Sequence, residues 1–220
     1  MDFGVMQSYL PLFVDALWLT MRIGWEGIVL AILIGLLCVI IIHLRIPVLR
    51  HIVTIYIEVF RNTPLLIQLF FIYFALPKIG IRLSPEFCGV LGLALLGGAY
   101  MTESFRSGLD NIAAIQTDSA LSLGMSRWQT IIHVILPQAV RSSIPGLMAN
   151  LIFLLKETSV FSTISLMDLM FTAKDLIGLY YNTTECLVML VVFYVIMLLP
   201  VSILGSVIEK KTRYKMFGDK

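Results

Sequence analysis

Residues 27–43 read GIVLAILIGLLCVIIIH and contain no Asp, Glu, Lys or Arg. The apolar character begins at Ile23, and the run ends at Arg45-Ile46-Pro47. A helix needs about 20 mostly apolar residues to cross the hydrocarbon core of a bilayer. The stretch Ile23–His43 therefore predicts a membrane-spanning helix.

The composition of the whole chain agrees with that prediction. Of its 220 residues, 59% are hydrophobic and 14% are charged, with a mean hydropathy of +0.93. Soluble domains carry roughly 25% charged residues. A surface this apolar suits lipid and would form large exposed patches in water. We expect an all-α integral membrane protein whose first helix, lacking a basic leader before it, is retained as an anchor.

Four more apolar stretches bring the prediction to about five spans, with a four-span alternative because the second and fourth are short. They are Thr63–Pro77 continued from Ile52–Phe60, then Phe87–Thr102, Ile144–Leu155 with possible extensions on either side, and Cys186–Val207. Cys38, Cys88 and Cys186 show no metal-ligand spacing and read as small buried hydrophobes. The net charge of +2 suggests no nucleic-acid partner, and we predict no metal site.

The basic residues predict an orientation. With five spans and the N-terminus outside, eleven Lys and Arg residues fall on the inside and three on the outside. Short cytoplasmic loops carry such an excess. The C-terminal tail and the Arg106–Arg141 connection are therefore predicted to be cytoplasmic. The inside set is Arg45, Arg50, Arg61, Arg106, Arg127, Arg141, Lys210, Lys211, Arg213, Lys215 and Lys220, and the outside set is Lys78, Arg82 and Lys174.

The Arg106–Arg141 connection is long enough to need structure of its own. A short helix over Gln116–Leu123 is expected to stop at Gly124, and a Ser126/Gln129 capping box opens a second helix at Arg127. We expect a break or kink at Pro137. Trp128, Ile131, Ile132 and Ile135 form an apolar face that must pack on the spans or on a partner. No phosphate-binding loop motif occurs, so another chain would have to bind any ATP.

Four sequence blocks in order resemble the permease subunits of ABC importers for polar amino acids. Residues 118–124 (DSALSLG) and 135–137 (ILP) are similar to the family's EAA signature, with Asp118 for Glu and Ser119 for the first Ala. Residues 58–69 (EVFRNTPLLIQL) resemble the Phe-Arg-Gly-Thr-Pro-Leu-Leu-x-Gln block, with Asn62 for Gly. Residues 103–108 (ESFRSG) and 155–159 (LKETS) match two further segments, with Ser107 for Gly. The agreement runs from about Trp18 to Lys211.

The resemblance implies a type I importer permease fold in a bacterial cytoplasmic membrane. Residues 1–220 would form one permease domain without an ATPase or substrate-binding domain. Its partners would be lipid, an identical or related second permease, two ATPases and an extracytoplasmic amino-acid-binding protein. This chain would hold no cofactor and would not be an enzyme, because the ATPases would bind ATP and Mg. The transported amino acid could be polar, acidic, basic or sulfur-containing.

The resemblance also makes residues 112–137 the segment that couples ATP hydrolysis to transport. A rigid helix seated in an ATPase groove can pass the ATPase motion to the spans. Gly124 allows a tight reversal. The alternative is that the apolar face packs only on the protein's own spans. The candidate coupling residues are Asp118, Ala120, Gly124, Arg127, Trp128 and Pro137.

Ionisable and amide groups within the spans are candidates for the substrate pathway, since charges in a bilayer are costly and usually paired or functional. Lys156, Glu157 and Ser159 offer partners for the carboxylate and ammonium of an amino acid, or else Lys156 and Glu157 form a structural pair or reach an interface by snorkelling. Helix discontinuities are expected at Thr63-Pro64 and at Ile144-Pro145. The remaining pathway candidates are Asn150, Glu103, Glu58, Thr63 and Gln68, with Glu58 and Arg61 also read as gate or subunit-contact residues.

Two further expectations concern the outer side. Arg22 and Glu26 are four residues apart and are predicted to pair on one face of the first span. Met167–Tyr181 is predicted to be an extracytoplasmic segment that docks the binding protein, or else a solvated loop helix. A secondary transporter would more often show internal repeats, a channel would not need the helix–Gly–helix, and an enzyme would need a convergent catalytic set. His43, His51 and His133 provide no such set.

Overall fold

The computed structural model describes the backbone of residues 1–217 and the side chains of residues 1–212. Every regular element in this part of the chain is helical. In order they are α1 (Phe3–His43), α2 (Pro47–Arg61), α3 (Leu65–Phe70), the π-helical η1 (Phe71–Ala75), the 3-10 η2 (Leu76–Ile79), α4 (Pro85–Asp110), α5 (Ala114–Ser122), α6 (Arg127–Thr130), the π-helical η3 (Ile131–Ile135), α7 (Leu136–Glu157), the 3-10 η4 (Thr158–Ile164), α8 (Leu169–Tyr180) and α9 (Thr183–Phe217).

Four helical segments are long and apolar enough to cross a membrane: Phe3–His43, Pro85–Asp110, Arg127–Ile164 and Thr183–Thr212. A fifth crossing arises if Pro47–Arg61 and Leu65–Ile79, which are bent by 105° relative to each other, count as one broken span. The all-α membrane fold with four to five spans is therefore confirmed.

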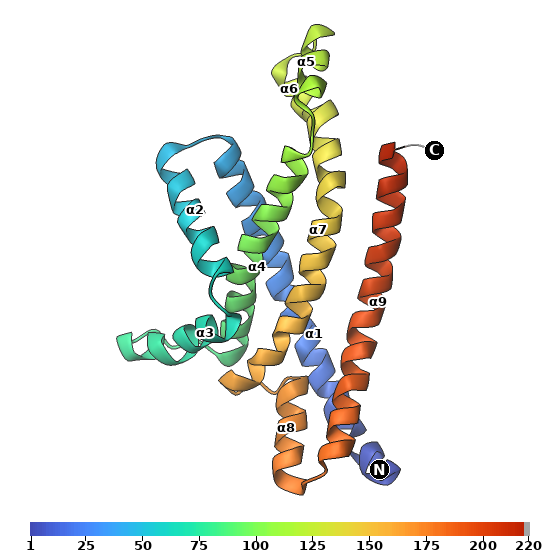
Figure 1. Ribbon diagram of the computed structural model, residues 1–220. Coiled ribbons are helices and arrows are strands. Elements are labelled where there is room, and N and C mark those ends of the chain that lie inside the picture. The colour runs from blue at the N-terminus through green and yellow to red at the C-terminus, as the bar shows by residue number, and fades with distance from the viewer. Residues whose placement is uncertain (218–220) are drawn as a thin grey trace.

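The connections between the long helices lie at the two ends of the bundle. The α1–α2 turn, α5 with α6, and the end of α9 lie at one end, and the N-terminus and α8 lie at the other (Figure 1). This arrangement is compatible with the predicted orientation, which stays a prediction. Lys220 and the side chains of Arg213 and Lys215 lie outside the described residues.

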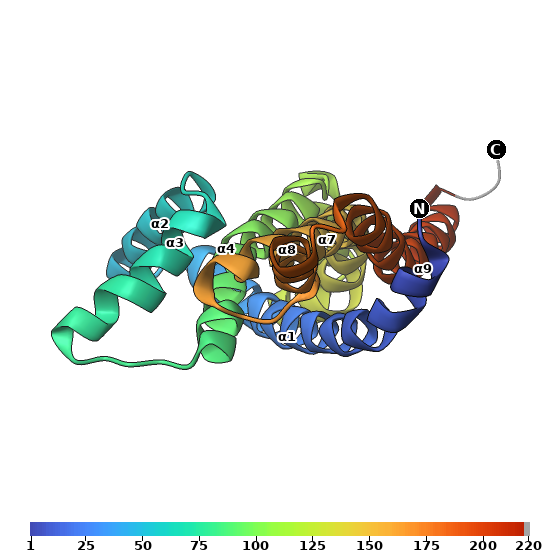
Figure 2. The same ribbon diagram turned by 90° about the horizontal axis from the view of Figure 1, so that it is seen from below.

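α4 is the central helix, in contact with α1, α2, α3 and α7. Figure 2 shows α1 along one side of the bundle, with α2 and α3 at one end and α9 at the other. Glycines allow the close approach: a Cβ built at Gly27 would lie 2.7 Å from Leu93 Cβ, and one at Gly35 would lie 2.7 Å from Met101 Cβ. Small residues at helix contacts are typical of membrane bundles, where packing rather than water exclusion drives association.

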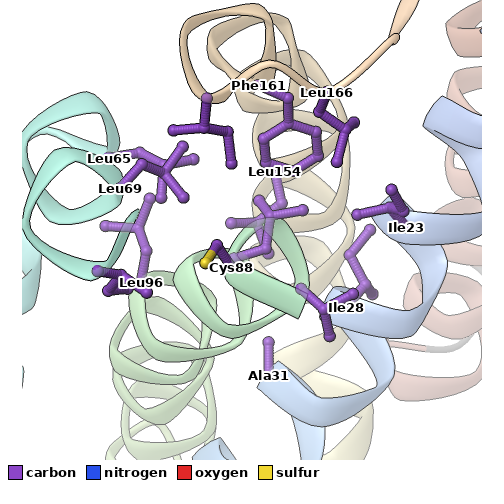
Figure 3. Packing of buried hydrophobic residues seen from close by; sticks show 14 of the residues in the cluster. Ile23, Ile28, Ala31, Leu65, Leu69, Cys88, Leu96, Leu154, Phe161 and Leu166 are labelled. Atoms are coloured by element: carbon purple, nitrogen blue, oxygen red, sulfur yellow. The ribbon is translucent and has the colours of Figure 1, made fainter. Parts of the chain in front are cut away.

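The main apolar core joins α1, α3, α4, α7 and η4. Ile23, Leu93, Leu154 and Phe161 are each 0% exposed within it. Figure 3 shows Ile28 and Ala31 of α1, Cys88 and Leu96 of α4, and Leu154 of α7 converging on this core. All three cysteines are buried and unbonded, as the sequence indicates.

A second apolar core lies where the first half of α1 packs on α8 and α9, around Phe13, Leu169 and Phe193. A buried polar contact lies beside it. Asp168 caps α8 by accepting hydrogen bonds from the amides of Phe171 at 3.0 Å and Met170 at 3.3 Å. Burial raises the pKa of the Asp168 carboxyl to about 7, although those amides and Lys174 lower it.

Several sequence expectations are wrong. The first helix begins at Phe3 rather than Ile23, because its first half has its own packing partners in α8 and α9. Arg22 pairs with Glu86 of α4 and not with Glu26, because the contact with α4 brings a nearer acid. Arg61 is the last residue of α2, at the bend of the broken span, and its predicted inside location stays a prediction.

The prolines behave differently from one another. The predicted discontinuity at Thr63-Pro64 is confirmed, and it is the 105° bend. The expected discontinuity at Ile144-Pro145 is wrong, and at Pro137 the helical path continues without a break. Pro137 follows the π-helical turn η3, in which the hydrogen-bond spacing widens, so the missing amide is tolerated at the start of α7. Pro145 is within α7, and the helix continues through it to Glu157.

Candidate functional site

The first candidate surface is the helix–Gly–helix segment at the α5–α6 end. α5 ends at Ser122, and Gly124 follows in the left-handed region with φ +82°. The amide of Met125 donates to the Ala120 carbonyl at 3.2 Å, and the Gly124 amide donates to the Leu121 carbonyl at 3.0 Å. This is a Schellman ending, in which glycine avoids the Cβ clash of a positive φ. The predicted stop at Gly124 is confirmed.

The second helix begins with the predicted capping box. The Ser126 amide donates to Gln129 Oε1 at 2.8 Å, and the Gln129 amide donates to Ser126 Oγ at 3.2 Å. From Arg127 the helical path continues through η3 into α7 and ends at Ile164 of η4. The segment is thus the first turn of a membrane-spanning helix, so that a displacement at Arg127 acts directly on the span.

The apolar face of this segment is exposed in the isolated chain. Trp128 is 72% exposed and Leu123 is 83% exposed, whereas Ala120 of the same segment is buried at 4%. Ile132 is also exposed. The alternative that this face packs only on the protein's own spans is therefore wrong. Of the other predicted coupling residues, Asp118, Gly124, Arg127 and Pro137 are all exposed.

The second candidate surface is a charged cluster where α2 meets α4. We call Arg61, Glu103 and Arg106 the central charge cluster. Glu103 Oε2 lies 3.1 Å from Arg106 Nη2 and 3.5 Å from Arg61 Nη1. The Arg61 guanidinium also lies over the Tyr100 ring, 5.4 Å from its centroid. The cluster thus joins the candidate span Pro85–Asp110 to the end of α2 at the bend of the broken span.

Helix geometry places Glu103 on the side of α4 that faces away from α1. Met101 packs against Gly35 of α1. Glu103 is two residues further along, roughly 200° around the helix at 3.6 residues per turn. Its side chain keeps 22% exposure, and that of Arg61 keeps 38%. The charged groups of Glu103 and Arg61 are therefore partly accessible at the α2–α4 contact.

Asn150 of α7 completes this region. Its amide donates to the Tyr100 carbonyl at 3.1 Å and to Ser104 Oγ at 2.9 Å. The Tyr100 ring packs against Phe153, with 5.2 Å between centroids. The structure therefore brings the predicted residues Glu103 and Asn150 to one stretch of α4. Sequence reasoning missed Tyr100 and Ser104, although both fall within one turn of Glu103.

The bend is held by local hydrogen bonds that involve Thr63, Gln68 and Glu58. Gln68 Nε2 donates to the carbonyls of Phe60 at 3.1 Å and Thr63 at 3.0 Å, and Thr63 Oγ1 donates to the Val59 carbonyl. Gln68 is 8% exposed, so it holds the bend from inside. Glu58 is exposed and accepts a hydrogen bond from Asn62 at 3.2 Å. These contacts join the two halves of the broken span.

Lys156, Glu157 and Ser159 lie near the far end of the same long helix. Lys156 is six residues beyond Asn150, roughly 9 Å along α7. It is exposed, Glu157 is half-buried, and the ion pairs among the described side chains do not join them. Their structural pairing is therefore wrong. The Ser159 carbonyl accepts a hydrogen bond from Ser162 Oγ at 3.3 Å.

The chain matches known proteins over most of its length. Residues 27–214 match the family model described as "Binding-protein-dependent transport system inner membrane component". A probable amino-acid permease, YxeN of Bacillus subtilis, is 32% identical over 95% of both chains. The glutamine transport permease GlnP of Escherichia coli K12 is 31% identical, with 96% of this chain and 98% of GlnP covered. The arginine transport permease ArtQ of B. subtilis is 30% identical, with 97% and 98% covered.

Solved structures show the same fold. A chain from a crystal structure of an amino acid ABC transporter with histidines superposes with a TM-score of 0.90 at 32% identity, covering 96% of this chain and 99% of the other. A chain of the inward-facing MetNI methionine ABC transporter gives a TM-score of 0.76 at 19% identity, with 96% and 99% covered. The second similarity supports the fold alone.

Proposed function

The chain belongs to the family of binding-protein-dependent transport system inner membrane components, and from that premise we propose how it couples ATP hydrolysis to uptake. It is an ABC-importer permease for amino acids and a multi-pass protein of the cytoplasmic membrane. In the proposed assembly it pairs with a second permease, identical or related, and with two ATPase subunits that bind ATP and Mg. An extracytoplasmic binding protein delivers the amino acid, which is polar in keeping with the glutamine and arginine permeases that the chain resembles.

The observation that carries the proposal is the exposure of Trp128 on a helix continuous with α7. An indole that is 72% exposed, in a segment where Leu123 and Ile132 are also exposed, is matched to an apolar groove on another protein. Asp118 and Arg127 are exposed in the same segment and carry opposite charges that suit a polar rim. Residues 112–137 are therefore the proposed ATPase-docking segment, and closure of the ATPase pair would move α7 as a rigid rod.

At the opposite end of the bundle, α8 is the proposed docking surface for the binding protein (Figure 1). Tyr181 follows α8 with φ +58° and is 85% exposed. Leu179 and Tyr180, the last two residues of α8, are also exposed, and the buried Asp168 caps the other end of the helix. A rigid helix that ends in exposed aromatic side chains provides a contact surface at low entropic cost.

Co-purification tests the coupling proposal. An affinity-tagged chain, expressed in its native host and solubilised from the membrane, should bring with it an ATPase that hydrolyses ATP in the eluate. Trp128→Ala should reduce the amount of bound ATPase by about tenfold or more, as expected for loss of an aromatic anchor. The matched control is Trp18→Ala, since Trp18 is 73% exposed on α1 and lies outside the segment.

Uptake provides the second measurement. Proteoliposomes that contain the complex and the binding protein should take up a labelled mixture of common L-amino acids only when ATP is present on the ATPase side. Trp128→Ala should abolish this uptake, and Trp18→Ala should not. Uptake driven by an ion gradient without an ATPase, or equal ATPase binding by both tryptophan variants, would contradict the proposal.

A further inference from the structure

The central charge cluster has an uneven charge balance. Two arginines, Arg61 and Arg106, approach the same carboxylate oxygen of Glu103, at 3.5 Å and 3.1 Å. Arg106 has a second acid at the 4.0 Å limit in Asp110, whose side chain is 75% exposed. Among the described ion pairs, Arg61 takes part only in the longer contact with Glu103. Arg61 is therefore the less tightly held cation.

The position of Arg61 also leaves it available. Its contact with Glu103 is an ion pair without a hydrogen bond, and its guanidinium lies over the Tyr100 ring at 5.4 Å. Stacking on an aromatic ring orients the guanidinium and leaves its N–H groups free to bind a planar anion. With 38% of its side chain exposed, Arg61 is accessible to a ligand that approaches along α4.

We propose that Arg61 and Glu103 form the site that binds the charged head group of the transported amino acid. Arg61 takes the α-carboxylate, Glu103 takes the α-ammonium, and their ion pair opens to admit the substrate. This inference rests on the proposed function as an amino-acid permease. It assigns the head-group chemistry to the α2–α4 contact and not to Lys156 and Glu157.

The need to pair each charge explains why a zwitterion suits this site. A charge left unpaired in a low-dielectric region is costly, so opening an ion pair is unfavourable unless both members find new partners. A zwitterion offers one anion and one cation, and both protein charges are compensated again. Arg106 stays with Glu103 at 3.1 Å while the pair is open. A ligand without a carboxylate would leave Arg61 without a counter-charge, and a ligand without an ammonium would leave Glu103 with Arg106 alone.

The neighbouring side chains complete the site. Asn150 fixes Ser104, one residue after Glu103, through a 2.9 Å hydrogen bond from α7. Tyr100 and Phe153 form an aromatic pair one turn before Glu103 and supply an apolar surface beside the head group. The site is thus built from α2, α4 and α7, and α7 is the helix that begins at the proposed ATPase-docking segment.

Saturation-transfer NMR tests the site directly, because it detects weak binding without the binding protein. The purified transporter complex in detergent is mixed with an equimolar set of the common L-amino acids, and separately with their α-amides and N-acetyl derivatives. The wild type should transfer saturation to at least one amino acid and about tenfold less to the matching amide and N-acetyl compound. Arg61→Gln should remove the preference for the acid over the amide, and Glu103→Gln should remove the preference over the N-acetyl compound.

The loss of one preference separates head-group binding from misfolding, which would weaken every ligand alike. The matched controls are Arg22→Gln and Glu86→Gln, which break an exposed α1–α4 ion pair elsewhere and should retain both preferences. Unchanged preferences in the Arg61 and Glu103 variants would overturn the site. So would the absence of any transfer to the wild type; if that protein still took up amino acids with ATP, the importer function would stand and only the site would fall.

Discussion

The contact among α1, α4 and α7 at Gly97 allows a sharp test of the packing. A Cβ built at Gly97 would lie 2.7 Å from Ala31 Cβ and 2.7 Å from Leu154 Cδ1. Carbon atoms pack best at about 3.5–4.0 Å, so Gly97→Ala creates a deficit of roughly 0.8–1.3 Å on two sides. The methyl of Ala31 has no rotamer that moves it away, and Leu154 is 0% exposed in the main core. The helices must therefore separate.

Gly178→Ala is the matched variant. Gly178 is in α8, and a Cβ built there has nothing within 4 Å. Both changes replace a helical glycine by alanine, which favours the helix by about 0.8–1.0 kcal/mol. That gain cancels in the comparison. The remaining difference is the overpacking at Gly97, which costs about 1–3 kcal/mol.

Thermal unfolding in detergent, followed by intrinsic tryptophan fluorescence, measures this difference. About 2–4 °C per kcal/mol applies to chains of 150–250 residues, so Gly97→Ala should melt roughly 2–12 °C below Gly178→Ala. Gly178→Ala should melt at or slightly above the wild type. A Gly97→Ala variant that melts with or above Gly178→Ala would refute the tight three-helix contact.

Three further predictions concern residues at the ends of helices. Gly124→Val should insert normally but lose ATP-driven uptake, because a β-branched residue is strained at φ +82°. Gly80→Val is the control: Gly80 has φ +90° and, like Gly124, has nothing within 4 Å of a built Cβ, but it lies outside the coupling segment, so this variant should retain uptake. The pKa of Asp168 is raised in the folded state, so its contribution to stability is present at about pH 4 and is lost as pH rises through about 7. The wild type should therefore melt at a lower temperature at pH 8 than at pH 5. Asp168→Asn should show no such difference. Ser126→Ala removes the cap of the second helix, costs about 1 kcal/mol locally, and should speed hydrogen exchange in the amides of α6 while leaving α9 unchanged.

Features encoded by a few neighbouring residues could be predicted from the sequence. Pro64 has no amide and restricts Thr63, and the structure bends there. The Ser126/Gln129 box and the stop at Gly124 depend only on residues within one turn, and both are present. The apolar run after Gly27 likewise suffices to predict a span, because length and hydropathy decide it.

Features that depend on packing between helices could not be predicted in this way. Arg22 pairs with Glu86, 64 residues away, and nothing local distinguishes that acid from Glu26. The long first half of α1 is fixed by its contacts with α8 and α9. Pro137 fails to end a helix because the π-helical turn before it changes the hydrogen-bond spacing, and that turn has no clear sequence signal.

The central charge cluster combines both cases, and α7 links it to the helix–Gly–helix segment. Glu103 and Asn150 are recognisable alone, as polar groups in apolar runs, but their meeting depends on how α4 packs against α7. That packing is tight at Gly146, where a Cβ would lie 2.8 Å from Ser104 Oγ. Asn150, one turn further along α7, holds the same hydroxyl at 2.9 Å. In the proposed mechanism a displacement of Trp128 travels roughly 33 Å along the helix to Asn150, since each residue adds about 1.5 Å. Because Ser104 is adjacent to Glu103, α7 cannot shift there without moving the acid that holds Arg61, and ATPase closure thereby acts on the substrate head-group site.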